Sequence, residues 1–358
     1  MTTIALRNTL RAYPKRSIST TAHTRAYSAH LSHHPSTSSP SYGTPPIPSI
    51  VTPNMTTATF KYMDPSTYNP SATEAFIKPW AKVDGPGYSF KLSDHQRSVQ
   101  DIRGRESDFS TDTSGFAVYN QPTSKDFGDY SDEALVRDSY YQEVENILRQ
   151  KLPGIKKVVI FDHTIRRNKK ASPRAPVQQV HVDQTPSAAA ARVRRHVSES
   201  EAEELLKGRY QIINVWRPIS HPASDFPLAV VDYRSTQPKD LVKVDLLYPS
   251  RDWTVDDDDR GKEKRPDASA HDSTSGYEVK GETFGVAPSD GHKFYYYKDM
   301  TPDETMFLKC FDSYSEVVDG GKERVAAYAP HTAFVDPQTS KEAKGRESIE
   351  VRCLVFYE

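Results

Sequence analysis

The first residues that could carry chemistry are a histidine and an aspartate two positions apart, in the segment His181-Val182-Asp183. Side chains at positions i and i+2 of a strand point to the same face, so an imidazole and a carboxylate would converge there. A metal ion could bind between them. With 12 histidines and 48 acidic residues in 358, such a pair arises about once or twice by chance, so its context must decide its meaning.

A second histidine, His331, lies in the segment Ala329-Pro-His-Thr-Ala-Phe334. Two histidines and one carboxylate form the facial triad, which occupies three of the six positions on Fe(II) and leaves the others for a bidentate co-substrate and oxygen. The alternative is a histidine that packs beside Phe334 and binds nothing. The chain has only two cysteines, which argues against a structural zinc site built from several thiolates.

The last apolar segment carries a row of polar residues. On a strand, Arg346, Ser348, Glu350 and Arg352 share one face, while the apolar residues between them share the other. Buried polar side chains require a ligand or each other as partners. An arginine with a hydroxyl nearby suits a carboxylate ligand bound through two hydrogen bonds.

Two further strand segments contain residues that could belong to a site. Trp216 and Arg217 could place an indole and a guanidinium at the mouth of a pocket, holding substrate or co-substrate. The alternative is an aromatic ring with a stacked cation and no function. Lys309 lies among apolar residues of another strand, and we expect its ammonium group to extend along the apolar surface to water; inward placement is the alternative.

The elements that must position these residues are mostly strands. The spacing of apolar residues predicts a helix over 131–152, and Thr185 with Pro186 predicts the start of a second helix. Ser198 and Glu201 predict a capping box and a third helix that ends at Gly208. After it come eight short β-branched or aromatic segments without intervening helices, which favours a mainly β fold with flanking helices, an antiparallel barrel or jelly roll. The predicted strands are 158–161, 178–183, 210–216, 228–233, 241–248, 278–286, 293–298, 305–311, 325–328 and 348–356.

Composition divides the chain into a leader and one domain. Residues 1–60 contain no acidic residue and are rich in Ser, Thr, Pro and His, so we expect a disordered or transit-like segment. Two readings stay open for it: a transit peptide directing the protein to mitochondria, or a leader without function in a protein that starts at Met55 and is cytoplasmic. Residues 61–358 are expected to form a single domain, with an extended N-terminal arm, a core over about 178–358 and a charged loop insertion over 256–276.

The balance of charges limits the partners. The chain has 47 Lys and Arg against 48 Asp and Glu, a formal net charge of −1. This gives no overall positive field for a nucleic-acid backbone, and no apolar run approaches the length of a membrane span. A small molecule is therefore the expected partner. Two cysteines cannot form a disulfide framework, which favours a reducing compartment.

Taken together, these stretches resemble the Fe(II)/2-oxoglutarate-dependent oxygenases, and more narrowly the fungal gibberellin-desaturase-like hydroxylase/desaturase group of secondary metabolism. The resemblance covers about residues 55–358 and has the order His-x-Asp, distal His, Arg-x-Ser. Its stretches are His181–Asp183, Asn214–Ile219, Pro227–Tyr233, Gly281–Phe284, Tyr295–Tyr297, Met300–Glu304, Phe311–Ser313, Pro330–Phe334 and Arg346–Arg352.

The resemblance implies a double-stranded β-helix of the cupin type, with Fe(II) bound by His181, Asp183 and His331. It implies 2-oxoglutarate as co-substrate and O2 as oxidant, acting on a small hydrophobic metabolite such as a terpenoid or polyketide. Arg346 with Ser348 matches the pattern that binds the distal carboxylate of 2-oxoglutarate, with Arg352 as the alternative and Arg217 as a further candidate.

Two other functions stay open at the level of sequence. A jelly-roll protein could bind a ligand without catalysis, although all three triad residues are present here. A methyltransferase-type group transfer is the other alternative. Against it, no Gly-rich loop between a strand and a helix is found that could hold a nucleotide-like cofactor.

Overall fold

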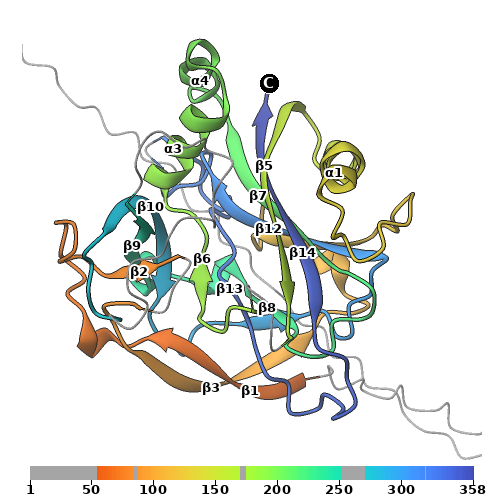
Figure 1. Ribbon diagram of the computed structural model, residues 1–358, viewed down its shortest axis with the longest axis horizontal. Coiled ribbons are helices and arrows are strands. Elements are labelled where there is room, and N and C mark those ends of the chain that lie inside the picture. The colour runs from red at the N-terminus through yellow and green to blue at the C-terminus, as the bar shows by residue number, and fades with distance from the viewer. Residues whose placement is uncertain (1–54, 84–86, 170–174, 251–270, 319) are drawn as a thin grey trace, which may run out of the picture. The chain divides into compact units, whose positions relative to one another are not determined.

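Two β-sheets form the centre of the structure, which is a computed structural model (Figure 1). It describes residues 55–83, 87–169, 175–250, 271–318 and 320–358. Residues 1–54 of the predicted leader, and residues 256–270 of the predicted charged insertion, lie outside the described residues.

Strands make up most of the regular structure. They are β1 (Met55–Met63), β2 (Trp80–Lys82), β3 (Leu92–Asp101), β4 (Phe116–Asn120), β5 (Ile155–Arg167), β6 (His181–Val182), β7 (Tyr210–Pro218), β8 (Leu228–Val231), β9 (Leu241–Pro249), β10 (Tyr277–Val286), β11 (Phe294–Tyr296), β12 (Glu304–Asp312), β13 (His331–Ala333) and β14 (Glu347–Tyr357). The longer helices are α2 (Tyr141–Lys151), α3 (Pro186–His196) and α4 (Glu199–Leu205). Short 3-10 turns occur at η1 (Pro65–Thr67), η2 (Glu106–Asp108), η4 (Tyr233–Ser235) and η5 (Pro238–Asp240).

The order of the strands defines a jelly roll. The larger sheet has nine strands in the order β1-β3-β11-β8-β13-β6-β10-β9-β2, and the smaller has five in the order β4-β12-β7-β14-β5. Neighbours are antiparallel except for the pairs β11–β3 and β2–β9. The chain crosses between the sheets repeatedly, with β6, β8 and β13 in one and β7, β12 and β14 in the other. This arrangement is the double-stranded β-helix that the sequence predicted.

The inner faces of the two sheets share one apolar core. Leu228 and Val230 of the larger sheet belong to the same buried cluster as Trp216, Met306 and Leu308 of the smaller sheet. Because side chains alternate along a strand, the residues between these point to the outer faces. Side chains on the inner faces can therefore reach a site between the sheets.

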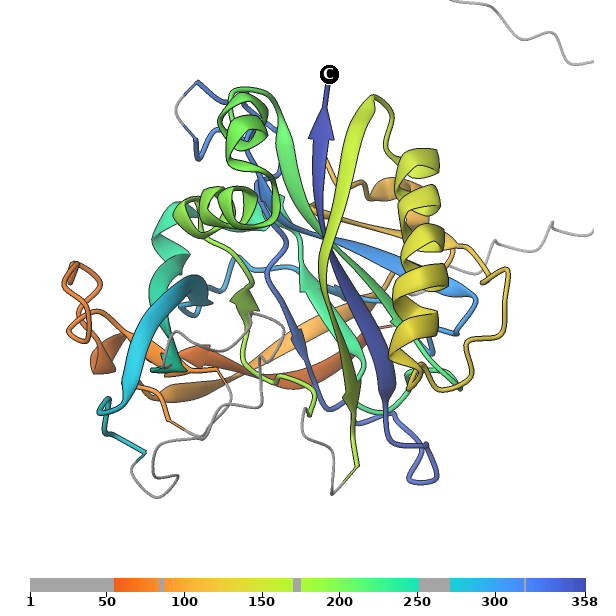
Figure 2. The ribbon, with the colours of Figure 1, turned by 45° about the horizontal axis from the view of Figure 1, so that its top comes forward.

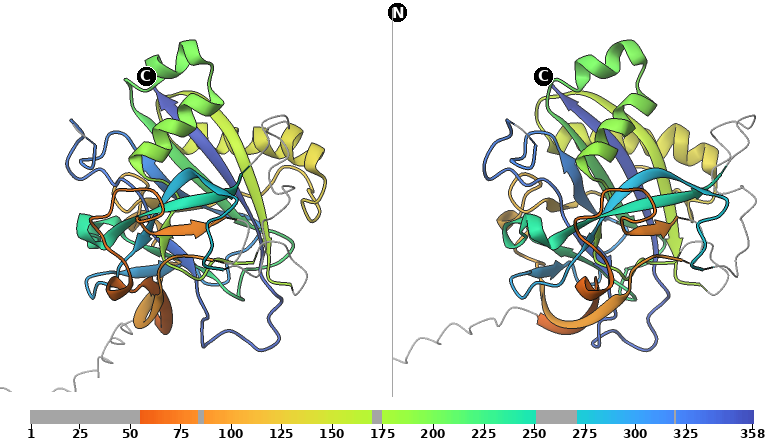
Figure 3. Two further views of the ribbon diagram at one scale, coloured as in Figure 1. Left: turned by 60° about the vertical axis from the view of Figure 1, so that its left-hand side comes forward. Right: turned by 90° about the vertical axis from the view of Figure 1, so that its left-hand side faces the viewer.

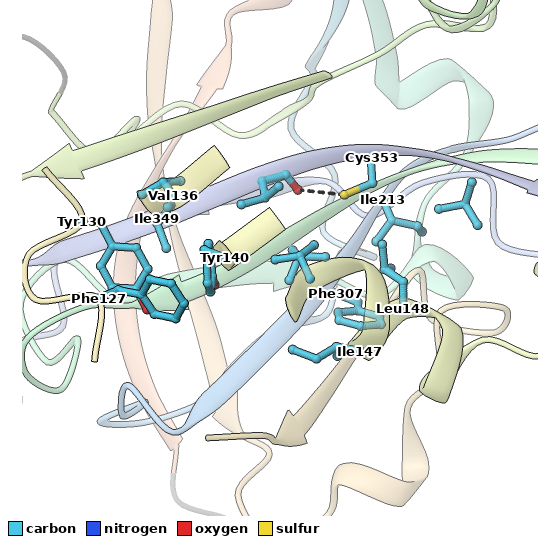
Figure 4. Packing of buried hydrophobic residues seen from close by; sticks show 14 of the residues in the cluster. Phe127, Tyr130, Val136, Tyr140, Ile147, Leu148, Ile213, Phe307, Ile349 and Cys353 are labelled. Atoms are coloured by element: carbon cyan, nitrogen blue, oxygen red, sulfur yellow. Dashed lines mark hydrogen bonds between the residues drawn. The ribbon is translucent and has the colours of Figure 1, made fainter. Parts of the chain in front are cut away.

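One helix covers the outer face of the smaller sheet. Helix α1 (Glu133–Leu135), a π-helical turn at Val136–Tyr140 and α2 follow one another without a break, which confirms the helix predicted over 131–152. It begins where the Asp132 side chain accepts a hydrogen bond from the Leu135 amide. Its apolar residues at three-to-four spacing pack on β7, β12 and β14 (Figures 2 and 4).

Helices α3 and α4 lie beside the C-terminal end of β14 (Figure 3). The Thr185 hydroxyl accepts a hydrogen bond from the Ala188 amide, so the predicted start of α3 is confirmed. The capping box predicted at Ser198 is not formed, because the Ser198 side chain makes no capping hydrogen bond. Helix α4 also ends at Leu205, before the predicted end at Gly208.

Several boundaries differ from the sequence predictions. Residues 55–60 pair with β3 as part of β1, so the predicted leader is wrong at its C-terminal end. The predicted N-terminal arm contains the strands β2, β3 and β4. Sequence patterns did not predict them, because polar residues and Pro or Gly interrupt the alternation of apolar residues. The predicted strand at 325–328 is not a strand; its apolar character reflects burial of Ala326, Ala327 and Tyr328 in an irregular segment. Within the described residues, no helix is long and apolar enough to cross a membrane.

Candidate active site

The three predicted metal ligands come from two short strands in the middle of the larger sheet and from the residue that follows one of them. His181 begins β6 and His331 begins β13, and the two residues are directly opposite in the antiparallel β6–β13 pair. The two strands are labelled near the centre of Figure 1. Cross-strand partners share a face, with Cβ atoms about 5 Å apart. Asp183 follows His181 by two residues and shares that face. The strand pairing therefore brings the three side chains together.

The distances fit a single small metal ion. Asp183 Oδ1 lies 3.4 Å from His181 Nε2 and 3.8 Å from His331 Nε2. One ligand atom from each of the three residues lies within 4.8 Å of the others. Among the residues that the structure describes, this is the one such group of His, Cys, Asp or Glu side chains.

Backbone carbonyl groups fix the orientation of both imidazoles. His181 Nδ1 lies 2.7 Å from the Gln179 carbonyl oxygen, and His331 Nδ1 lies 3.0 Å from that of Ala329. A proton on each Nδ1 leaves the lone pair of Nε2 directed to the site, as in metal-binding histidines. Burial and the neighbouring His181 lower the pKa of His331 to about 4, so this ring is neutral at pH 7 and ready to bind a metal.

The second oxygen of the aspartate is engaged elsewhere. Asp183 Oδ2 lies 3.4 Å from Arg352 Nε and 3.7 Å from Cys310 Sγ. Burial alone would raise the pKa of Asp183, but Arg352 and the two histidines hold it well below its usual value. The carboxylate is therefore ionised and presents Oδ1 to the histidines. Burial raises the pKa of Cys310 well above its usual value, so its thiol is neutral.

Arg346 is a buried cation with an unused donor. It is 2% exposed, and its Nη1 donates to the Phe226 carbonyl oxygen at 2.7 Å, whereas its Nε has no hydrogen-bond partner. Its guanidinium carbon lies 5.7 Å from the centre of the Trp216 ring. Burial and the nearby Arg166 lower the pKa of Arg346 to about 9, which leaves it charged at pH 7. Such a group favours an anionic ligand.

The other predicted co-substrate residues are placed differently. Arg352 donates to Asp183, Asp162, Thr164 and Glu350, so its hydrogen-bonding capacity is already used. Ser348 is buried on the same strand face as Glu350. Unlike Glu350, it is not among the residues that line the small pocket beside the triad.

Arg217 lies on the opposite face of β7 from Trp216. It bonds to Tyr140 Oη and the Pro302 carbonyl oxygen under the helix. The structure therefore does not bring Arg217 to the site, because successive strand residues point to opposite faces. Lys309 is also not where the sequence predicted: its ammonium group is fully buried and paired with Asp112 and Asp312.

A small pocket beside the triad is lined by polar residues from both sheets and by apolar ones. The polar residues include Arg166, Arg346 and Glu350, and the apolar ones include Val177, Trp216, Leu228, Leu308 and Ala333. Burial opposes ionisation of Glu350, but Arg166 and Arg352 lower its pKa to about 2. The sequence analysis gave Arg166 no role, because the strand predicted over 158–161 was too short to include it; in the structure Arg166 lies in β5 and pairs with Ser348.

A larger hollow lies apart from the triad. It is lined by residues such as Ser224, Tyr296, Asp299 and Asp336, and no triad residue contributes to it. The pocket beside the triad, although smaller, is therefore the one that adjoins the candidate metal ligands.

The fold and the ligand set define a class of protein. A jelly roll with two histidines and one carboxylate on one face, next to a buried arginine whose Nε has no hydrogen-bond partner, has the donor set of a non-haem Fe(II) oxygenase. The site fits iron because its three candidate ligand atoms are two imidazole nitrogens and one carboxylate oxygen, the donor set of the facial triad. It fits 2-oxoglutarate because the buried guanidinium of Arg346 lines the same pocket as the three candidate metal ligands.

Comparison with known proteins agrees with this class. The family described as Oxidoreductase/YMDC permease-like domain matches residues 60–356. The chain is 33% identical over 277 residues to "Hydroxylase/desaturase efuI" of Hormonema carpetanum, covering 73% of this chain and 83% of that protein. It is 31% identical over 323 residues to "Hydroxylase/desaturase poxK" of Penicillium oxalicum, covering 87% and 92% respectively.

A further relative connects sequence and structure. The chain is 30% identical over 273 residues to "Fe(II)/2-oxoglutarate-dependent dioxygenase nvfI" of Aspergillus novofumigatus, covering 75% of this chain and 85% of that protein. The solved structure of the "iron and alpha-ketoglutarate-dependent endoperoxidase NvfI" matches with a TM-score of 0.64 and 26% identity, covering 85% of this chain and 98% of that one. The chain therefore belongs to this fungal hydroxylase/desaturase family of Fe(II)/2-oxoglutarate-dependent dioxygenases.

Proposed function

We propose that this enzyme oxidises a small, largely apolar metabolite, with iron held by His181, Asp183 and His331 and 2-oxoglutarate held by Arg346. The observation that carries the proposal is the convergence of two Nε2 atoms and Asp183 Oδ1 beside a buried guanidinium with a free Nε. The other charged side chains of the pocket are already paired with one another, as Glu350 is with Arg166 and Arg352.

The side chains of the protein bind iron and 2-oxoglutarate and fix the orientation of the metal ligands. When bound, iron and 2-oxoglutarate supply the activation of oxygen, which amino-acid side chains cannot provide. The three ligands lie on one face and leave the opposite side open to exogenous groups. The backbone contacts of both Nδ1 atoms hold the rings in place, and Arg352 holds the free oxygen of Asp183.

The pocket wall favours an apolar substrate. Val177, Leu228, Leu308 and Ala333 contribute hydrocarbon surface next to the triad, and Trp216 contributes an indole ring. The relatives are named hydroxylase/desaturases, and a further one is named "Aspirochlorine biosynthesis protein N". These names support a substrate from secondary metabolism and an outcome of either hydroxylation or desaturation.

The test uses a product that does not depend on that outcome. Purified protein given Fe(II), ascorbate and 2-oxoglutarate should release succinate even without substrate, and His181→Ala should reduce release to the background level. His221→Ala serves as the control, because His221 lies outside the triad and its Nδ1 contacts only the Pro222 carbonyl oxygen. Equal succinate from wild type and His181→Ala would remove the enzymatic proposal.

A further inference from the structure

Glu350 is a buried carboxylate whose hydrogen bonds all fall on one of its two oxygen atoms. Oε1 accepts from Nε and Nη2 of Arg166 and from Nη2 of Arg352, at 2.7 to 3.2 Å. Among the described residues, no donor lies within hydrogen-bond distance of Oε2. The side chain is 9% exposed and lines the pocket beside the triad. Oε2 is therefore available to a ligand in this pocket.

The strand pairing places this carboxylate in the pocket wall. Ile349 and Val351 pack in the cluster under helix α2, so Glu350 between them points to the inner face of β14. Its cross-strand partner on β7 is Trp216, which also lines the pocket. Because two guanidinium groups bond to Oε1, the carboxylate cannot turn without losing these bonds, and Oε2 keeps its orientation.

The charge of this oxygen limits which ligand can face it. Burial opposes ionisation of Glu350, but Arg166 and Arg352 lower its pKa to about 2, so it is ionised at neutral pH. A buried ionised oxygen without a donor is unfavourable until a donor reaches it. A second carboxylate, such as that of 2-oxoglutarate, would be repelled, and a hydrocarbon group would leave the oxygen without a hydrogen bond. The complementary ligand is a neutral group that carries an O–H or N–H bond.

We propose that Glu350 is a specificity-determining residue, whose Oε2 accepts a hydrogen bond from a hydroxyl or amide N–H group of the substrate. This inference rests on the proposed function and narrows its substrate class to apolar metabolites that bring such a donor into the pocket. The apolar side chains of the wall and this single acceptor line the same pocket. A hydrogen bond to an ionised acceptor is stronger than one to a neutral acceptor, and a site built for a donor rejects an analogue that lacks it.

The experiment uses two small probes that differ in one donor, benzyl alcohol and benzyl methyl ether. Each is titrated into the full-length protein loaded with Mn(II) and 2-oxoglutarate. Mn(II) enhances the NMR relaxation of protons in molecules bound near it, so the relaxation of each probe reports binding beside the triad. The wild type should bind the alcohol about tenfold or more tightly than the ether, as expected for a hydrogen bond to a charged group.

Glu350→Gln tests the oxygen itself. The glutamine can keep its oxygen on the arginines, and it then presents an NH2 donor in place of Oε2. The preference for the alcohol should fall to within about threefold or reverse, because the ether oxygen can accept from this amide. Glu347→Gln is the matched control: Glu347 is also a buried glutamate of β14, but it lies on the opposite strand face beside Arg167. It should keep the preference of the wild type.

Three results would overturn the inference. Equal affinity of the two probes for the wild type would show that water, and not a substrate group, is the partner of Oε2; this comparison needs no variant. An undiminished preference for the alcohol in folded Glu350→Gln would place the acceptor elsewhere. Relaxation of neither probe by Mn(II) would show that no such ligand enters the pocket. Absence of Mn(II) or 2-oxoglutarate binding in the wild type would instead overturn the proposed function, and this inference with it.

Discussion

The assignment of the co-substrate arginine can be tested with Arg346→Gln. Arg346 uses one donor on the Phe226 carbonyl oxygen and leaves Nε free, so a dicarboxylate can receive a two-donor contact. Hydrogen bonds to charged groups contribute about 1.5–3 kcal/mol each, so two give about 3–6 kcal/mol. At about 1.4 kcal/mol for each tenfold change, the dissociation constant of 2-oxoglutarate should rise at least about 100-fold.

The assay is a calorimetric titration of the Mn(II)-loaded protein with 2-oxoglutarate. Arg217→Gln is the matched control, because Arg217 is also a buried arginine but bonds to Tyr140 and to the Pro302 carbonyl oxygen under the helix. It should lower stability and leave 2-oxoglutarate affinity unchanged. A folded Arg346→Gln protein that binds Mn(II) normally and 2-oxoglutarate within threefold of wild type would refute the assignment.

Two further predictions concern regions away from the triad. Lys309→Met should lower the free energy of unfolding by about 3 kcal/mol, because buried Asp312 then keeps Arg209 but loses the Lys309 ammonium group. The Mn(II) affinity should stay unchanged. A loss of stability under about 1 kcal/mol in urea unfolding would contradict this prediction. Burial lowers the pKa of His292 below 6.5, although Asp240 opposes the shift. The unfolded chain therefore binds a proton at this histidine more readily than the folded protein does. Stability should fall as the pH drops below about 6.5. His292→Gln should make that decline shallower in unfolding curves between pH 6.5 and 5, and an unchanged slope would count against the assignment.

The fold predicted from the sequence is confirmed, whereas several element boundaries are not, and the roles of the predicted metal ligands stay a prediction. The spacing of His181 and Asp183 was enough to pair them. Their proximity to His331 depends on the register of β6 and β13, and in the sequence analysis the family resemblance implied that all three residues bind one ion. The sequence pattern favoured Arg346 with Ser348 and kept Arg352, on the same strand face, as the alternative. The difference between them comes from partners such as Asp162, which no local pattern reveals.

Other misses have physical causes. Arg217 and Trp216 are neighbours in the chain but point to opposite faces, so they could not both reach the pocket. Lys309 was expected to reach water, yet acidic residues from distant segments compensate its charge in the interior. The location of the protein, cytoplasmic or mitochondrial, stays a prediction.

The direct pairing of His181 with His331 has a consequence for how this enzyme can diversify. The two ligands are held by register between a two-residue and a three-residue strand, and not by the length of chain that joins them. Loops in the intervening 147 residues after Asp183 can therefore lengthen or shorten without moving the ligands, provided that the sheet order is kept. A family built in this way can acquire new substrates by exchanging loops around an unchanged catalytic centre.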